Sequence, residues 1–175
     1  MNDAADGVKS PAERFADAKR RVTAAKSQLA QFAASYEFGL DSFQVAACES
    51  LEQGRSVLVA APTGSGKTVV GEFAVFLALS SGTRAFYTTP IKALSNQKYR
   101  DLCRRHGNAN VGLLTGDSVI NGDAPIVVMT TEVLRNMLYE HSTAIHTLSH
   151  VVMDEVHYLA DRQRGAVWEE VILHL

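Results

Sequence analysis

The segment SVLVAAPTGSGKT, residues 56–68, decides the fold of this chain. Its first half is apolar and predicts a buried strand over Ser56–Ala60. Its second half matches a phosphate-binding loop, although Ala61 stands where the strict pattern has glycine. A helix is expected next, over Lys67–Leu79. A strand, a glycine-rich turn and a helix in this order predict that the chain binds the phosphates of a nucleotide at the start of that helix.

Each residue type in the loop suits a contact with phosphate or metal. Gly64 and Gly66 let successive backbone N–H groups point inward at phosphate oxygens, and the start of the helix adds a partial positive charge there. Lys67 can reach the β- and γ-phosphates, and the Thr68 hydroxyl can bind Mg²⁺. The candidate nucleotide-binding residues of the loop are Pro62, Thr63, Gly64, Ser65, Gly66, Lys67 and Thr68.

After the loop, apolar strands alternate with amphipathic helices. This alternation predicts an α/β fold in which a parallel sheet carries helices on both faces. The expected strands are Ala85–Thr89, Val111–Leu114, Ile126–Thr130 and His150–Asp154, and the expected helices are Ile91–Arg105, Glu132–Tyr139 and a last one from Gly165 onward.

Residues before the loop are expected to be helical. The segment Ser10–Glu13 combines a capping box with proline at the first helical position, and an apolar stripe from Phe15 to Phe32 predicts one long amphipathic helix. A second, short helix is expected after Asp41 and ends at Gly54.

Two adjacent acids follow an apolar strand later in the chain. Acidic residues are costly at the carboxyl edge of a sheet unless they bind something, and ligands of open α/β sheets bind at that edge. Asp154 can hold Mg²⁺ through water, and Glu155 can orient and deprotonate the water that attacks the γ-phosphate. His157 could donate to a phosphate or to a neighbouring element. The candidate catalytic residues are therefore Lys67, Asp154, Glu155 and His157, and the candidate metal ligands are Thr68 and Asp154.

Composition narrows the classes of protein further. The 175 residues are 46% hydrophobic and 21% charged with a net charge of −2, which excludes disordered, collagen-like and disulfide-rich chains. Contact with nucleic acid therefore requires a local patch, such as residues 84–105, where six basic residues stand against Asp101 alone.

Cys48 and Cys103 follow no metal-ligand spacing and are expected to be reduced and mostly buried. We expect an N-terminal tail and amphipathic helix over residues 1–35 and a nucleotide-binding domain over residues 36–175.

No segment predicts export or membrane insertion. The first thirty residues lack the apolar core of a secretory signal, and the apolar run Phe73–Leu79 is far too short to span a bilayer. A cytoplasmic protein without a membrane partner is therefore expected. The apolar helix over residues 167–175 stops without a polar cap, which favours truncation inside a longer protein over a buried terminal helix.

Further motifs accompany the loop and the acidic pair. They are TTPIKALSNQ at residues 88–97, TGD at 115–117, TTEVLR at 130–135, DEVH at 154–157, and Asp161 followed by RGAVWEE at 164–170. With these motifs the chain, from about Phe38 to its C-terminus, resembles the first RecA-like domain of a superfamily 2 DExH-box helicase. More narrowly, it is similar to the Ski-type, exosome-associated RNA helicases and their bacterial, actinobacterial-style relatives. Alanine at the start of the phosphate loop is usual in helicases, so Ala61 favours this family over small GTPases and kinases.

The resemblance implies roles for residues outside the loop. Gln44 would read adenine and Phe38 would stack on the base, since an amide fork and an aromatic face suit adenine. The segments with which such helicases grip the nucleic-acid backbone contain Pro90, Lys92, Ala93, Thr115, Gly116, Thr131 and Glu132. The implied cofactors are ATP and Mg²⁺. The implied partners are single-stranded RNA, or alternatively DNA, the second RecA-like domain and accessory domains of a longer chain, and an RNA-degradation complex.

Several functions remain open at this point. The leading one is the ATP-binding core of an RNA-dependent ATPase and helicase, with 3′–5′ translocation implied by the resemblance. The alternatives are a DNA helicase of the same superfamily and a transport or signalling NTPase without nucleic acid, for which Gln44 and Pro90–Gln97 would have no use. The isolated chain is expected to bind nucleotide but to hydrolyse and unwind poorly, because an arginine finger on the absent second domain contributes about 10³–10⁵ in rate. Trp168 is expected to anchor the core rather than to stack on a base.

Overall fold

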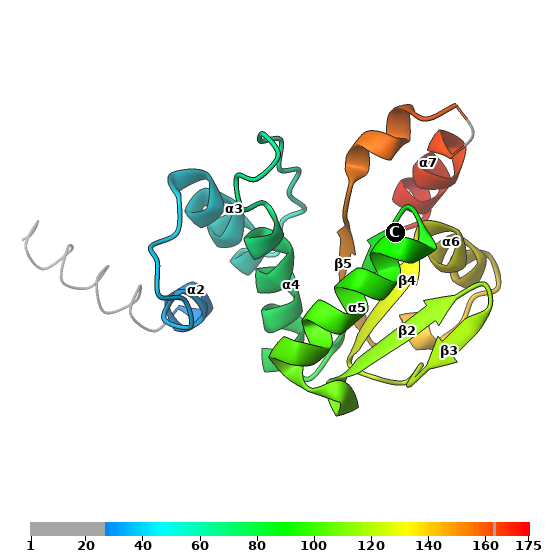
Figure 1. Cartoon of the computed structure of the whole chain (residues 1–175), viewed down its shortest axis with the longest axis horizontal. Coiled ribbons are helices and arrows are strands. Elements are labelled where there is room, and N and C mark those ends of the chain that lie inside the picture. The colour runs from blue at the N-terminus through cyan, green and yellow to red at the C-terminus, as the bar shows by residue number, and fades with distance from the viewer. Residues whose placement is uncertain (1–26, 163) are drawn as a thin grey trace, which may run out of the picture. The chain divides into compact units, whose positions relative to one another are not determined.

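The computed structural model describes residues 27–162 and 164–175. The chain divides into two compact units, of which the first ends at Val57 and the second spans Leu58–Leu175. Figure 1 shows the helices and strands of both units. Most of the helix predicted by the N-terminal apolar stripe lies outside the described residues, and the domain boundary expected near residue 36 stays a prediction.

The first unit contains two described helices, α2 (Gln28–Ala33) and α3 (Ser42–Glu52). Helix α2 begins at Ser27, whose Oγ accepts a hydrogen bond from the Ala30 N–H at 3.1 Å. Helix α3 begins at Asp41, and the Gln44 side chain reaches back so that its Oε1 accepts a hydrogen bond from the Asp41 N–H at 2.8 Å. Such a capping box pairs backbone groups that the first turn leaves unpaired. The helix expected after Asp41 is confirmed.

The second unit is a sheet with helices. Its strands are β1 (Arg84–Thr89), β2 (Val111–Thr115), β3 (Ser118–Ile120), β4 (Ile126–Thr130) and β5 (Leu148–Met153). Its α-helices are α4 (Thr68–Ser80), α5 (Lys92–His106), α6 (Thr131–Tyr139) and α7 (Gly165–His174), and its 3₁₀ helices are η1 (Asn108–Asn110), η2 (Thr143–Ile145) and η3 (Val156–Ala160). All the strands and helices expected after residue 66 are present, with small shifts at their ends.

The strands lie in the order β3-β2-β4-β1-β5. Strands β1, β2, β4 and β5 are parallel, and β3 pairs antiparallel with β2 at the edge. The α/β fold with a parallel sheet is therefore confirmed. The three residues of β3 are too few to show a hydrophobic period, which explains why the sequence did not predict this strand.

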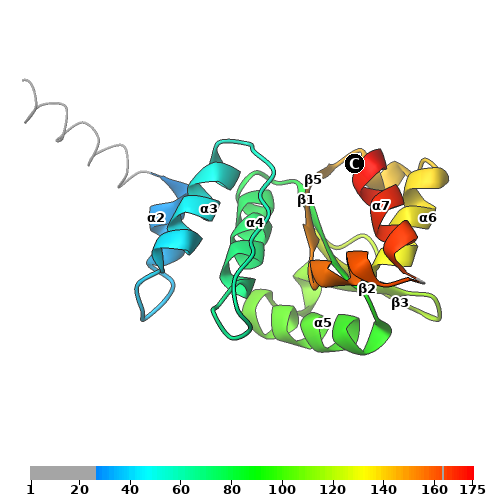
Figure 2. The same ribbon diagram turned by 90° about the horizontal axis from the view of Figure 1, so that it is seen from above.

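Side chains of the four parallel strands alternate between two cores. On one face of the sheet, Tyr87 lies in a buried cluster with Val75 of α4 and Leu102 of α5. On the opposite face, Phe86 lies in a buried cluster that includes residues of α6 and α7. Figure 2 shows α5 on one side of the sheet and α6 and α7 on the other. The prediction of helices on both faces is confirmed.

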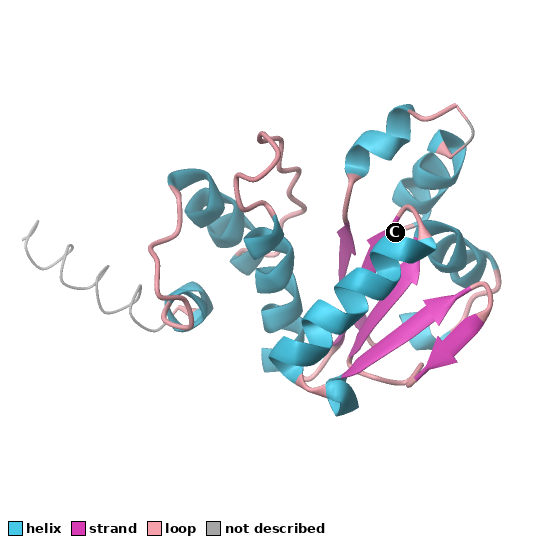
Figure 3. Cartoon of the chain, in the orientation of Figure 1, coloured by secondary structure: helices cyan, strands magenta, loops and turns pink. Residues whose placement is uncertain are grey.

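The strand predicted over Ser56–Ala60 is wrong. Residues 55–62 have no regular secondary structure (Figure 3), and Leu58 is 76% exposed. A strand requires a neighbour that pairs with its backbone N–H and C=O groups. In the described part of the chain, β5 at the edge of the sheet pairs only with β1. The apolar run predicts burial, but it carries no information about the pairing partner.

The two cysteines are free thiols. Cys48 is buried, and this burial, with a smaller effect from Glu52, raises the pKa of the thiol to about 12, so the group is uncharged at neutral pH. Cys103 on α5 is half-buried. Among the described residues, no helix is both long enough and apolar enough to cross a membrane.

Gly112 in β2 lies where the backbone of Asn121 comes close. A Cβ atom at position 112 would lie 2.1 Å from the Asn121 carbonyl oxygen, and Nδ2 of Asn121 is itself tied to the Ala109 carbonyl oxygen at 3.0 Å. We expect Gly112→Ala to lower the local free energy of opening by about 1–3 kcal/mol, the usual cost of overpacking. Hydrogen exchange of peptides across residues 111–120 measures this change. Gly122→Ala is the control, since its Cβ would make only ordinary contact, and an equal effect of both variants would contradict the prediction.

Candidate nucleotide-binding and nucleic-acid-binding edge

The carboxyl ends of four parallel strands carry most of the site residues predicted in the second unit outside the phosphate loop. Across the sheet, β2 is followed by Gly116, β4 by Thr131–Glu132, β1 by Pro90–Ala93 and β5 by Asp154–Glu155. Parallel strands place their carboxyl ends on one edge, which is where open α/β sheets bind ligands. Tertiary structure therefore gathers at one edge the segments that the sequence analysis could only place one after another.

The backbone of the phosphate loop has the conformation that its glycines predict. Gly64 and Gly66 have φ angles of +81° and +78°, a region that favours glycine because it lacks Cβ. Helix α4 begins at Thr68 directly after them, so the partial positive charge of its N-terminus lies at the loop. Pro62 and Thr63 lead into this turn.

Two side chains of the loop offer hydrogen-bond donors. The Lys67 Nζ donates to the carbonyl oxygens of Ala61 at 2.6 Å and Pro62 at 2.8 Å, so the ammonium folds back over its own loop. The Ser65 Oγ is buried and has no hydrogen-bond partner among the described residues. Unpaired buried hydroxyls are uncommon in proteins. A bound phosphate that accepts this hydrogen bond is one explanation for the Ser65 hydroxyl.

Asp154 and Glu155 form a tight turn after β5. The Asp154 N–H donates to the Thr88 carbonyl oxygen at 3.0 Å, which extends the pairing of β5 with β1, and the Glu155 N–H donates to Oδ1 of Asp154 at 2.9 Å. Glu155 has φ +58° and ψ +43°, a left-handed conformation that is uncommon outside glycine and frequent at functional sites. Oε2 of Glu155 lies 3.2 Å from Nδ1 of His157. The turn thus separates the two carboxylates, each with its own partners.

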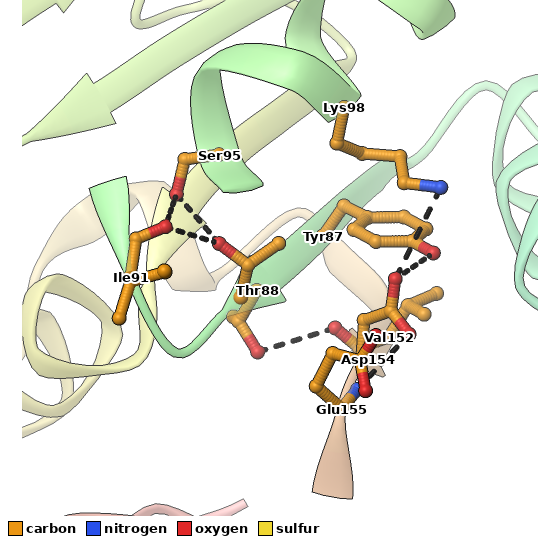
Figure 4. A network of polar contacts seen from close by, with 9 residues as sticks. Tyr87, Thr88, Ile91, Ser95, Lys98, Val152, Asp154 and Glu155 are labelled. Carbon is orange, nitrogen blue, oxygen red and sulfur yellow. Dashed lines mark hydrogen bonds and ion pairs between the residues drawn. The ribbon is translucent and has the colours of Figure 1, made fainter. Parts of the chain in front are cut away.

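The carboxylate of Asp154 has partners from β1 and α5 (Figure 4). The Tyr87 hydroxyl donates to Oδ2 of Asp154 at 2.9 Å, and the Lys98 Nζ lies 4.0 Å from the same oxygen and 4.9 Å from the centre of the Tyr87 ring. Burial, and then the carboxylate of Asp154, raises the pKa of Tyr87 well above its ordinary value, so the phenol keeps its proton at neutral pH. Neither partner of Asp154 was predicted from the sequence. Tyr87 is one of several large residues in a strand and Lys98 one of six basic residues, so no local signal marks either.

Lys92 and Thr115, both candidates for nucleic-acid contact, meet at Asp117. The Lys92 ammonium pairs with Oδ2 of Asp117, and the Thr115 hydroxyl donates to Oδ1 at 3.0 Å. The hydrogen bond from Lys92, followed by that from Thr115, lowers the pKa of Asp117 below its ordinary value. Asp117 of the TGD motif thus connects the two predicted site residues Lys92 and Thr115.

Thr131 and Pro90 are also tied into the protein. The buried Thr131 hydroxyl donates to the Thr89 carbonyl oxygen at 3.4 Å, and Nη1 of Arg164 donates to the Pro90 carbonyl oxygen at 2.6 Å. Helices α5 and α6 begin next to these residues without a side-chain cap, and the first N–H groups of a helix lack partners within it. Because the Thr115 and Thr131 hydroxyls both donate to protein atoms, the donors that suit a phosphate here are the backbone N–H groups at these two helix starts.

The basic segment over residues 84–105 is largely balanced by acids, three of which come from elsewhere in the second unit. Its ion pairs are Lys92–Asp117, Lys98–Asp154, Arg104–Asp101 and Arg105–Glu72. Arg84 instead donates to the carbonyl oxygens of Gly122 and Ala124. The local excess of positive charge seen in the sequence is therefore much smaller in the folded second unit.

Phe38 and Gln44 belong to the first unit. Phe38 is 57% exposed with its ring 5.0 Å from that of Tyr36, whereas Gln44 is 3% exposed and its Oε1 serves the capping box of α3. An exposed ring suits stacking on a base. Their assignment to adenine stays a prediction.

A glycine-rich loop that opens a helix, with acids at the carboxyl edge of a parallel sheet, defines the class of P-loop nucleotide-binding α/β domains. Within that class, residues 41–175 match the DEAD/DEAH box helicase family, and the chain belongs to this family.

Individual relatives agree with this assignment. The chain is 68% identical over 149 residues to the probable helicase HelY of Mycobacterium leprae, and the aligned residues cover 85% of this chain and 16% of that protein. It is 52% identical over 143 residues to the ATP-dependent RNA helicase mtr4 of Schizosaccharomyces pombe, covering 82% of this chain and 13% of that protein. The chain thus spans only a small part of the length of these relatives. The expected likeness to Ski-type helicases and bacterial relatives is confirmed.

The fold agrees with solved helicase structures. The helicase Lhr of Mycobacterium smegmatis, bound to single-stranded DNA and AMP-PNP, superposes with a TM-score of 0.61 at 28% sequence identity, covering 86% of this chain and 23% of that chain. A hypothetical ATP-dependent RNA helicase from Sulfolobus tokodaii superposes with a TM-score of 0.63 at 20% identity, covering 85% of this chain and 47% of that chain, and supports the fold alone. The RecA-like fold expected from the sequence is confirmed.

Proposed function

We propose that this chain is the ATP-binding first RecA-like domain of an ATP-dependent RNA helicase that hydrolyses ATP when single-stranded RNA is bound. The observation that carries this proposal is the shared edge of the sheet. Asp154 and Glu155 follow β5, while the candidate nucleic-acid segments follow β1, β2 and β4 of the same sheet. One edge therefore carries both candidate sites, as a motor that couples hydrolysis to its grip on a strand requires.

The phosphate loop fits the phosphates of ATP. Gly64 and Gly66 have the positive φ angles that let backbone N–H groups face an anion, and the buried Ser65 hydroxyl lacks a partner among the described residues. Thr68 and Asp154 would hold Mg²⁺, which keeps several waters and needs only one or two protein ligands. The described residues contain no group of three His, Cys, Asp or Glu that could hold a metal, which suits this mode of binding better than a zinc-type site.

The residues of the site divide the chemistry between them. Lys67 would leave the carbonyl oxygens of Ala61 and Pro62 and turn to the β- and γ-phosphates. Glu155 would accept the proton of the attacking water, with His157 at 3.2 Å holding its carboxylate. When bound, Mg²⁺ would neutralise charge that develops on the phosphates.

The partners of this domain follow from the same proposal. A second RecA-like domain would supply arginine fingers, and accessory domains would complete a longer chain, so the isolated fragment would bind nucleotide but hydrolyse it poorly. In that longer protein, Gln44 and Phe38 would select adenine. Translocation in the 3′–5′ direction and membership of an RNA-degradation complex are supported by the likeness to Ski-type helicases.

The choice of RNA over DNA is supported by the more similar relative. The mtr4 protein, at 52% identity, is named an RNA helicase, whereas the Lhr structure, at 28% identity, contains single-stranded DNA. The donors at the starts of α5 and α6 suit phosphates, which both nucleic acids share. A DNA helicase of the same superfamily is therefore the second candidate.

An ATPase assay of the full-length protein tests the proposal. We expect single-stranded RNA to stimulate turnover strongly and single-stranded DNA of the same sequence to do so less. Stimulation by DNA alone would support the second candidate. No stimulation by either nucleic acid would contradict a helicase function.

A further inference from the structure

The carboxylate of Asp154, the proposed ligand of Mg²⁺, already has three partners. Oδ1 accepts the Glu155 N–H at 2.9 Å, and Oδ2 accepts the Tyr87 hydroxyl at 2.9 Å and faces the Lys98 ammonium at 4.0 Å. Figure 4 shows Tyr87 and Lys98 converging on the same oxygen from β1 and α5. An ion that binds here must therefore act against, or together with, these partners.

The two partners of Oδ2 differ in how firmly they are held. Tyr87 is 1% exposed, and a Cβ atom added at Gly71 of α4 would lie 3.5 Å from its hydroxyl oxygen, so α4 lies close to the phenol. The Lys98 side chain is 16% exposed and its ammonium rests over the Tyr87 ring at 4.9 Å. The phenol is thus a fixed neutral donor, while the ammonium is a charge at the outer limit of an ion pair.

The charges around Asp154 leave Lys98 with a distinct role. Arg105 of the same helix pairs with Glu72 of α4, whereas Lys98 faces Asp154 itself. A positive charge nearby stabilises the ionised form of a carboxylate. Lys98 places such a charge 4.0 Å from Oδ2 of Asp154.

We propose that Tyr87 and Lys98 are positioning residues with opposite effects on Mg²⁺ at Asp154. The Tyr87 hydroxyl holds the carboxylate in place for the ion. The Lys98 ammonium is a resident counter-cation with which the ion competes. This inference rests on the proposed function, because it takes Asp154 as the ligand of Mg²⁺.

Loss of either group is expected to change the contribution of Mg²⁺ to nucleotide binding in a defined direction. Removing the Lys98 charge removes a like charge that repels Mg²⁺ and a cation that attracts metal-free ATP, so the ion contributes more to nucleotide binding. Removing the Tyr87 hydroxyl releases Oδ2, and the carboxylate can then turn into a closer pair with Lys98, so the ion contributes less. Two residues that served only to stabilise the fold would not shift this contribution in opposite directions.

Calorimetric titration of the full-length protein with AMP-PNP, in excess Mg²⁺ and in EDTA, tests this inference without turnover. The measured quantity is the dissociation constant in EDTA divided by that in Mg²⁺. We expect Lys98→Met to raise this ratio about three- to thirtyfold and Tyr87→Phe to lower it about three- to tenfold. Lys98→Arg keeps the charge and is expected to stay near the wild-type ratio.

Arg100→Met is the matched control, because Arg100 is an exposed basic residue of the same helix. Its ratio is expected to equal that of the wild type, and thermal unfolding identifies any variant that fails to fold. Unchanged ratios for Lys98→Met and Tyr87→Phe in a protein whose wild type does show a Mg²⁺ effect would overturn this inference alone, as would shifts of the same sign. A wild type that binds no AMP-PNP would overturn the proposed function as well.

Discussion

Glu155→Gln in the full-length protein is expected to lower ATP turnover about 10²- to 10⁴-fold while ATP stays bound, because Glu155 is the proposed proton acceptor for the attacking water. The amide is nearly the same size as the carboxylate and can keep the contact with His157, which lies 3.2 Å from Oε2. Gln and Glu have the same branching at Cβ, so the substitution is expected to leave the left-handed backbone at this position unchanged. Turnover is measured as phosphate release at saturating ATP and RNA, and binding is measured separately by titration.

Glu140→Gln is the control for loss of a negative charge, since Glu140 is an exposed residue at the end of α6, remote in sequence from the DEVH motif. Its turnover is expected to match the wild type. Undiminished turnover of Glu155→Gln would remove Glu155 from the role of general base. Loss of nucleotide binding together with turnover would instead assign Glu155 to binding.

Trp168→Ala is expected to lower the local stability of α7 by about 3–5 kcal/mol, the usual cost of deleting a buried aromatic side chain. Trp168 is 1% exposed and is the largest fully buried side chain described. With Gly165 and Val171 it forms the buried face of α7, which packs against α6 and η3. A Cβ atom at Gly165 would lie 2.4 Å from the Leu159 carbonyl oxygen of η3, so the two elements are in close contact. Since η3 follows Glu155 directly, loosening α7 is also expected to weaken nucleotide binding.

Hydrogen exchange of peptides over residues 165–175 measures this change and does not depend on the single tryptophan as a fluorescent probe. Leu173→Ala is the matched control, because Leu173 lies on the same helix and is 82% exposed. Its effect is expected to be within about 0.5 kcal/mol. Equal protection in Trp168→Ala and the wild type would show that Trp168 is not a core anchor.

Local signals predicted most elements of the fold. The helix expected after Asp41 and before Gly54 is α3, and the apolar runs predicted β1, β2, β4 and β5, because helix ends and periodic burial depend on a few neighbouring residues. The conformation of the phosphate loop was also predictable, since only glycine readily adopts the φ angles found at positions 64 and 66.

Structural features that depend on residues far apart in the sequence, such as strand pairing and charge balance, could not be predicted. The run Ser56–Ala60 is as apolar as the true strands, yet it forms no ladder, because pairing depends on a partner that the run does not specify. The same holds for charge. The basic segment predicted from composition is balanced by Glu72, Asp117 and Asp154, which come from three other parts of the second unit.

The sequence by itself determined the class of protein and the family to which the chain belongs. The phosphate loop, the acidic pair and the ordered motifs are short segments that can be recognised from neighbouring residues alone, so their identity is enough to indicate a helicase domain of this family. Only the tertiary structure decided which groups surround Asp154. Tyr87 and Lys98 reach it because β1 pairs with β5 and α5 packs on the sheet, and electrostatic contacts of this kind depend on distance in space rather than on separation along the chain.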